Sequence, residues 1–104
     1  MVYRYRIFQL PINNRFCFLG FDETMSHDTW GGRFDYVSVY AASIDADSIG
    51  DALERIWRLH NADDRPSGVC FRSLSVSDVV TIDGIPYYCD RFGWSEIPKD
   101  RWDT

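Results

Sequence analysis

The most reactive side chains in this chain belong to three cysteines and two histidines. A thiol acts as a nucleophile when a neighbouring histidine serves as its base and a backbone donor stabilises the oxyanion. Cys70 and His60 come closest to such a pair, because both flank the connection between an expected helix and the next strand. Neither lies in a glycine-rich elbow or in a cysteine-protease motif. We therefore expect no catalytic residues and no enzymatic activity.

The remaining cysteines, Cys17 and Cys89, complete no metal site and no disulfide framework. The cysteines are odd in number, no CxxC pair begins a zinc site, and His27 is isolated from His60. We expect no metal, no cofactor and thiols that stay reduced in the cytoplasm. The N-terminal segment fits that compartment, since it lacks the basic and apolar regions of a secretory signal, and no apolar stretch could span a membrane.

Acidic residues outnumber basic ones by 16 to 11, which gives a net charge of -5. This charge disfavours binding to a nucleic-acid backbone and suits a protein partner with a basic surface, although it also simply favours solubility. Asp51 and Glu54 share one face of an expected helix at a spacing of three residues. Together with two carboxylates just upstream they form what we call the acidic cluster, our candidate partner-binding site: Asp45, Asp47, Asp51 and Glu54.

Arginines are interleaved with aromatic residues in two segments, residues 3–6 and residues 91–94. Such a pattern can stack single-stranded bases on the rings while the arginines contact the backbone. The same alternation has the two-residue period of a β-strand, which places the rings in a core. We expect the core role, and keep weak single-stranded nucleic-acid binding as an alternative.

Apolar residues at spacings of three and four predict one main helix over residues 48–60. Ser48 is the expected N-cap, with Asp51 three residues later in the place of the glutamate of a capping box. Glu54 and Arg58 are one turn apart and should form an ion pair. The stripe that would face the core consists of Ile49, Leu53, Ile56, Trp57 and His60.

Short strands are expected on both sides of this helix. Asp83-Gly84 is a strong signal for a two-residue hairpin turn, because both central positions need a positive φ. Pro86 has no amide hydrogen, so we expect it at an edge of the sheet. The predicted strands cover residues 2–10, 36–41, 79–82, 85–89 and 94–97, and a further apolar run over residues 15–21 would supply a sixth.

A short helical turn is expected over residues 22–28, with Asp22 as its N-cap. The chain is long enough for one domain, residues 1–104, with a core of its own. The elements together predict an α+β fold, in which a small, mostly antiparallel sheet of five or six short strands packs on the main amphipathic helix.

The stretch over residues 73–94, SLSVSDVVTIDGIPYYCDRFGW, resembles the core signature of the YodL-like domain. Earlier blocks resemble the same family in order: a YRIF strand, an FLGFDE segment, a YVSVY strand and a single helix, so that the likeness covers residues 3–97. The resemblance implies an accessory domain of bacterial mobile elements and names no reaction. The signature residues, for which we expect structural roles, are Ser75, Ser77, Asp78, Gly84, Tyr88, Asp90, Gly93 and Trp94.

Ser75, Ser77 and Asp78 directly precede a predicted strand. Side chains of these types accept hydrogen bonds from nearby backbone amides in turns, which explains a polar block at the start of an apolar run. In the alternative interpretation, Asp78 and Asp90 face a partner or ligand.

These observations predict a non-enzymatic protein-interaction module of a phage or another mobile element. Its most specific form is an inhibitor of host defence, of the restriction or CRISPR type, that presents the acidic cluster to a basic nucleic-acid-binding groove. The alternative is a structural or regulatory adaptor in element replication or transfer that uses a sheet edge near Pro86. Neither hypothesis involves a membrane, and both leave the oligomeric state open.

Overall fold

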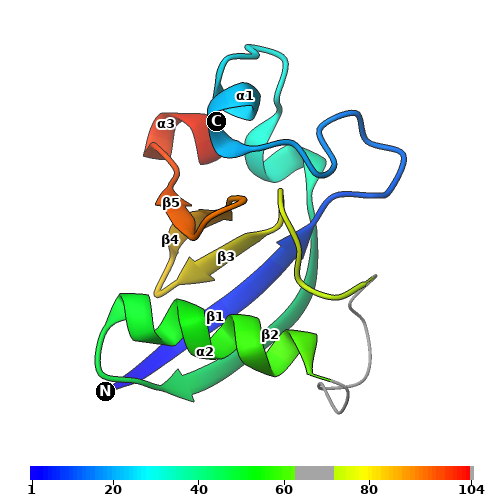
Figure 1. Ribbon diagram of the computed structural model, residues 1–104. Helices are drawn as coiled ribbons and strands as arrows, with labels where there is room; N and C mark the ends of the chain where they lie inside the picture. Colours follow the sequence, from blue (N-terminus) through cyan, green and yellow to red (C-terminus); the bar gives the residue numbers. More distant parts are fainter. Residues whose placement is uncertain (63–71, 104) are drawn as a thin grey trace.

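The computed structural model describes residues 1–62 and 72–103 of the chain. Within these residues one antiparallel sheet contains five strands in the order β2-β1-β3-β4-β5 (Figure 1). The strands are β1 (Val2–Gln9), β2 (Val37–Asp45), β3 (Val79–Ile82), β4 (Ile85–Cys89) and β5 (Trp94–Glu96). The helices are α1 (Phe21–Met25), the 3-10 helix η1 (Gly32–Asp35), α2 (Ile49–Asn61) and α3 (Lys99–Trp102). The α+β fold expected from the sequence is therefore confirmed.

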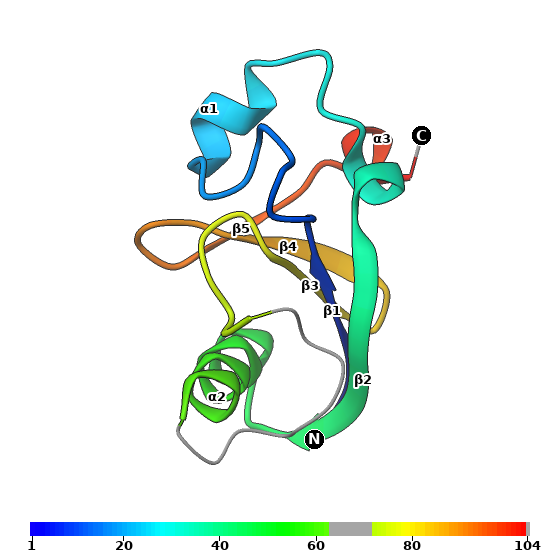
Figure 2. The same ribbon diagram turned by 90° about the vertical axis from the view of Figure 1, so that its right-hand side faces the viewer.

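The described residues form two hydrophobic clusters on opposite faces of the sheet, because neighbouring residues of a strand point to opposite sides. Tyr5 and Ile7 of β1 lie in the cluster beneath α2, together with Leu53 and Ile56 of the helix. Phe8 begins the other cluster, which is covered by α1, α3 and the segment around η1. Figure 2 shows α2 near one end of the sheet, and α1 and α3 near the other. Each large buried side chain contributes about 1.5–3 kcal/mol to folding.

The second cluster consists largely of aromatic rings in edge-to-face contact. The rings of Phe8 and Trp102 are 5.2 Å apart, and those of Trp30 and Tyr88 are 6.3 Å apart. Such contacts add to the area effect. They hold α3 onto the sheet, although its four residues could not form a stable helix alone.

Helix α2 begins as expected from the sequence. Oγ of Ser48 accepts a hydrogen bond from the amide of Asp51 at 3.1 Å. The Asp51 carboxylate reaches back to the amide of Asp47, 3.0 Å away, rather than to that of the cap residue. The first bond satisfies an amide of the first turn that has no partner within the helix, and such a cap contributes about 1 kcal/mol. The expected pair of Glu54 and Arg58 is also present, at 3.5 Å.

The β3–β4 hairpin turns at Asp83-Gly84, with φ values of 49° and 87°, as predicted. The expectation that Pro86 lies at a sheet edge is wrong, because β4 is an inner strand between β3 and β5. The carbonyl of Pro86 accepts a hydrogen bond from the amide of Ile97, just beyond the end of β5. A strand residue points its nitrogen and carbonyl to the same side. The missing amide hydrogen therefore falls where the ladder stops, so the sheet tolerates this proline.

Residues 15–21 form a turn and the beginning of α1 and not a sixth strand, and two further boundaries also differ from the sequence-based expectation. Helix α1 has Gly20 as its N-cap, so that Asp22 lies inside the first turn and caps nothing. Strand β2 continues to Asp45, since it pairs with the whole length of β1. None of the described helices is long and apolar enough to cross a membrane. The expected loop over residues 63–68 and Cys70 lie outside the described residues.

Candidate partner-binding site

The acidic cluster is distributed over the end of β2 and the first two turns of α2. Asp45 lies 3.1 Å from the amino nitrogen of Met1, Asp51 lies 3.0 Å from Arg55, and Glu54 pairs with Arg58. The backbone amide of Asp47, followed by Arg55, lowers the pKa of Asp51. These pairs are exposed and screened by solvent, so they contribute little to stability. They nevertheless reduce the negative charge that this surface presents to a partner.

Two signature residues of β4 and the following turn connect the sheet to α1. Oδ1 of Asp90 accepts hydrogen bonds from the amides of Phe21 (3.1 Å) and Arg91 (2.9 Å). The hydroxyl of Tyr88 donates to the carbonyl of Leu19 at 2.7 Å and lies 2.8 Å from Oγ1 of Thr24. The side chains of Tyr88 and Asp90 therefore fix the α1 region onto the sheet.

Asp78 is fully buried and surrounded by donors. Its Oδ2 accepts hydrogen bonds from the Ser75 amide (2.8 Å) and from Nε2 of Gln9 (3.0 Å), and its Oδ1 from Arg72 (3.2 Å). Burial raises the pKa of Asp78 to about 6, against the opposing effects of the Ser75 amide, the Gln9 side chain and the Arg72 charge. A carboxylate held in this way positions the chain before β3 and does not face a partner.

Ser77 is also buried, with a φ of 82° that a non-glycine residue adopts only when its surroundings hold it there. Its Oγ accepts a hydrogen bond from the amide of Phe18 at 2.9 Å, and its carbonyl accepts one from the Tyr36 hydroxyl at 2.6 Å. The residue thus joins three distant segments. These contacts give Ser77, like Asp78, a role inside the protein.

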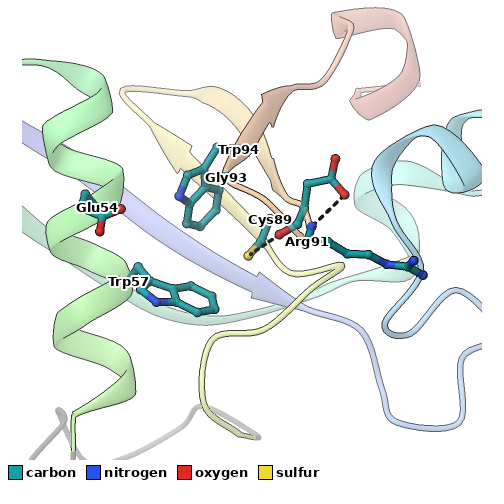
Figure 3. Close-up of a pocket in the computed structure, with 7 residues that line it drawn as sticks. Glu54, Trp57, Cys89, Arg91, Gly93 and Trp94 are labelled. Carbon is teal, nitrogen blue, oxygen red and sulfur yellow. Dashed lines mark hydrogen bonds between the residues drawn. The ribbon is translucent and has the colours of Figure 1, made fainter.

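A cleft of about 230 Å³ separates α2 from the β4–β5 turn (Figure 3). Trp57 of α2 and Trp94 of β5 direct their indole rings into it from opposite sides, as Figure 3 shows. We call this feature the indole cleft; its lining residues are Glu54, Trp57, Cys89, Asp90, Arg91, Gly93 and Trp94. Four of these were candidate site residues from the sequence: Glu54, Asp90, Gly93 and Trp94.

Trp57 is the lining residue that the sequence analysis assigned only to the core. Its side chain is 36% exposed, because it lies at the margin of the helical stripe and faces the β4–β5 turn instead of the sheet centre. The turn itself depends on Gly93, whose φ of 87° favours glycine and whose carbonyl accepts a hydrogen bond from the amide of Asp90. Phe92, between two lining residues, is 97% exposed.

The charges around the indole cleft are unevenly placed. The guanidinium of Arg91 points away from the indoles toward α1 (Figure 3), and the carboxylate of Asp90 faces the amide of Phe21. Glu54 is thus the charged lining side chain on the indole side. Cys89 is only 2% exposed, and burial raises the pKa of its thiol to about 12, so that it stays protonated and unreactive at neutral pH.

Residues 4–99 match the family model described as the YodL-like domain. The chain belongs to the YodL-like domain family. No curated protein and no solved structure matches it. The matched range contains every residue of the indole cleft, so the cleft is part of the YodL-like domain itself.

The structure places one member of the cysteine–histidine pair considered from the sequence. His60 is buried, with its Nε2 2.9 Å from the Tyr5 hydroxyl, and burial lowers its pKa. Its expected partner Cys70 is outside the described residues. Among the residues that the structure describes, no three histidine, cysteine or acidic side chains gather as a metal site. The rings of Tyr3 and Tyr5 are buried, so they cannot stack nucleic-acid bases, whereas Phe92 in the segment 91–94 is exposed and base stacking there stays a prediction.

Proposed function

We propose that this YodL-like domain is a non-enzymatic protein-interaction module, and that the indole cleft is its contact site. The observation that carries the proposal is the pair of indole rings, Trp57 and Trp94, which two separate elements direct into one cleft. Tryptophan is among the residues that contribute most binding energy at protein interfaces. Phe92, at the exposed tip of the adjoining turn, adds apolar area beside the cleft.

The cleft suits a cationic side chain of the partner, an arginine or a lysine. An indole face attracts a cation with about 0.5–2 kcal/mol. Glu54 supplies the negative charge on the indole side, and its 3.5 Å contact with Arg58 is solvent-exposed and therefore easily exchanged. The net charge of -5 assists the approach of a basic partner.

Fluorescence anisotropy with two labelled peptides tests this proposal. One probe is Gly-Arg-Gly-Arg-Gly, and the matched probe carries glutamate at the arginine positions. We expect the arginine probe to bind with a Kd in the millimolar range or below, and the glutamate probe not to bind. Equal binding of the two probes, or binding that survives the loss of both indoles, contradicts the proposal.

We further propose a biological setting for this module. A phage or mobile element would use the domain in the host cytoplasm against a basic, nucleic-acid-handling protein of a restriction or CRISPR-type defence. The support is the net charge of -5 and the expectation, implied by the resemblance to the YodL-like domain, that such a domain is an accessory of mobile elements. Because Asp45 and Asp51, two carboxylates of the acidic cluster outside the cleft, are already paired with described cations, the indole cleft is the better contact.

Activity assays with purified defence nucleases distinguish the two surfaces. Under this proposal, added domain lowers the cleavage rate, and replacement of Trp57 and Trp94 by leucine restores it. Charge reversal confined to Asp45 and Asp47 leaves inhibition within about twofold, since exposed charges contribute little each. Loss of inhibition in that variant, with the indole variants still active, would assign the contact to the acidic cluster.

A further inference from the structure

The outer edge of β2 presents backbone groups that no described strand pairs with. Their positions follow from the register of β1 and β2. The amide of Ala46 donates to the carbonyl of Met1 at 2.9 Å, and the Met1 nitrogen donates to the Ala46 carbonyl at 3.0 Å. Hydrogen-bonded and non-hydrogen-bonded pairs alternate along an antiparallel ladder. Ile44 and Ala42 therefore point their backbone groups toward β1.

By the same alternation, Ala41, Ser43 and Asp45 point their amides and carbonyls outward from the sheet. The pairing on the other side of β1 agrees with this assignment. Arg4 directs its carbonyl to the amide of Asp83 and therefore away from β2, so Ser43, which is opposite Arg4, forms no backbone hydrogen bond with it. The outward residues are all exposed. The strand sequence VSVYAASID contains neither proline nor lysine, the residues that commonly protect an edge.

The sheet face beside this edge carries two arginines and two carboxylates, of which Asp45 is paired with the amino group of Met1 and Asp83 with the backbone amide of Arg4. Arg4 and Arg6 share a face with the small side chains of Ala41 and Ser43, their cross-strand neighbours. A hollow of about 500 Å³ lies there, and neither arginine pairs with a described carboxylate. Nη1 of Arg6 reaches to Oγ of Ser38 on β2 at 3.0 Å. The guanidinium of Arg6 therefore reaches β2, the strand to which an added strand would pair.

We propose that the β2 edge binds an extended acidic segment of a partner protein, which adds to the sheet beyond β2. The three outward residues would supply the main-chain hydrogen bonds of such strand addition. Acidic side chains at alternate positions of the added strand would lie on the face of Arg4 and Arg6, with Ala41 and Ser43 small enough to leave them room. The carboxylate of Asp83 lines the same hollow and accepts a hydrogen bond from the Arg4 amide at 3.0 Å, so it offsets part of the positive charge, although it lies on the far side of β1 from the added strand.

Charge also selects this occupant over a second copy of the chain. Antiparallel pairing of two β2 edges uses a twofold axis perpendicular to the sheet, which brings the same face of both copies together. Both β2 strands would then separate Arg4 and Arg6 of one copy from those of the other by about 14 Å, so these like charges repel weakly across the pairing. An acidic strand from another protein meets complementary charge instead. This surface is separate from the indole cleft, and its occupation does not depend on the function proposed for the cleft.

Two labelled peptides test the proposal: Thr-Glu-Val-Glu-Val-Glu-Thr and a matched peptide with lysine for glutamate. The glutamate peptide should bind about tenfold more tightly, as expected for two or three exposed charge pairs. The double change Arg4→Glu and Arg6→Glu should reverse this preference. Ser43→Pro removes one outward amide and should abolish binding, while Ser43→Ala retains that amide and should bind normally.

Hydrogen exchange locates the contact independently of affinity. The amides of Ala41, Ser43 and Asp45 should exchange quickly in the free protein and slowly with the glutamate peptide bound. Circular dichroism must show that Ser43→Pro is folded; if it is not, protection of these three amides in the unaltered protein decides the matter. Equal binding of both peptides, unchanged exchange at β2, or a dimer formed through this edge would overturn the proposal.

Discussion

The carboxylate of Asp90 accepts a hydrogen bond from the backbone amide of Phe21 at 3.1 Å, across 69 residues of sequence. The bond supplies a cap to α1, whose own N-cap residue, Gly20, has no side chain to give. The turn that carries Asp90 also carries Gly93 and leads into Trp94. One side chain thus couples the position of α1 to the wall of the indole cleft.

Asp90→Ala should lower the free energy of unfolding by about 1 kcal/mol, the usual effect of losing a helix cap. Asp90→Asn keeps an acceptor oxygen and should cost clearly less. Urea denaturation measures both values, and hydrogen exchange at the Phe21 amide should become faster in the alanine variant alone. Identical losses in the two variants would show that the capping bond is not the cause.

Asp78→Asn should destabilise the protein by roughly 1–3 kcal/mol, because a buried donor replaces an acceptor that faces three donors. Ser75→Ala is the matched control, since Ser75 reaches Asp78 through its backbone amide, which alanine retains. Its cost should be small. Denaturation curves of equal slope would confirm that both changes act on the folded state. An Asp78→Asn variant with unchanged free energy of unfolding would contradict this role of the hydrogen bonds to Asp78.

The contribution of Asp78 to stability should depend on pH. Burial raises its pKa in the folded protein to about 6, above the ordinary value near 3.9. The folded state therefore holds the proton more tightly, so this contribution is present in full below the ordinary pKa and is lost as the pH rises through 6. The stability difference between the unaltered protein and Asp78→Asn should be larger at pH 5 than at pH 7.5, by about 1 kcal/mol.

His60 changes stability in the opposite direction but cancels in that comparison. Burial lowers its pKa, so its unfolded form binds protons more readily and stability falls as the pH drops through about 6.5. Both proteins contain His60, and their difference isolates Asp78. An NMR titration of the Asp78 carboxyl carbon gives the pKa directly. A midpoint at or below 4 would show that the three donors outweigh burial.

Trp57→Leu and Trp94→Leu should each weaken binding of the arginine peptide by about tenfold, through loss of one cation–π contact. Glu54→Gln should weaken it by a smaller factor, about two- to fivefold. Glu23→Gln is the control, because this exposed carboxylate lies on α1 and does not line the cleft. Equal effects of the two glutamate changes would mean that net charge alone drives the binding.

The elements that could be predicted from the sequence are those whose cause is local. The hairpin depends on the positive φ of Asp83 and Gly84, and α2 on its own apolar period and the Ser48 cap. Helix α3 was missed, since Trp102 holds it in place through contact with Phe8, far away in the sequence. Such contacts leave no periodic signal in a segment of four residues.

The candidate site was predictable only in part for the same reason. Glu54, Gly93 and Trp94 were named individually, but only the folded chain brings α2 next to the β4–β5 turn. Trp57 has the spacing of a core residue, and its position at the margin of the stripe exposes it. The inner position of Pro86 also follows from tertiary structure, because the sheet continues beyond it with the short strand β5.

The indole resonances in a two-dimensional NMR titration test the central claim most directly, because the chain contains four tryptophans. Trp57 and Trp94 line the cleft, whereas Trp30 and Trp102 are only 4% and 3% exposed in the second cluster. On addition of the arginine peptide, the indole signals of Trp57 and Trp94 should shift together while those of Trp30 and Trp102 stay in place. Shifts of all four signals, or of none at saturating peptide, would contradict a binding site in the indole cleft.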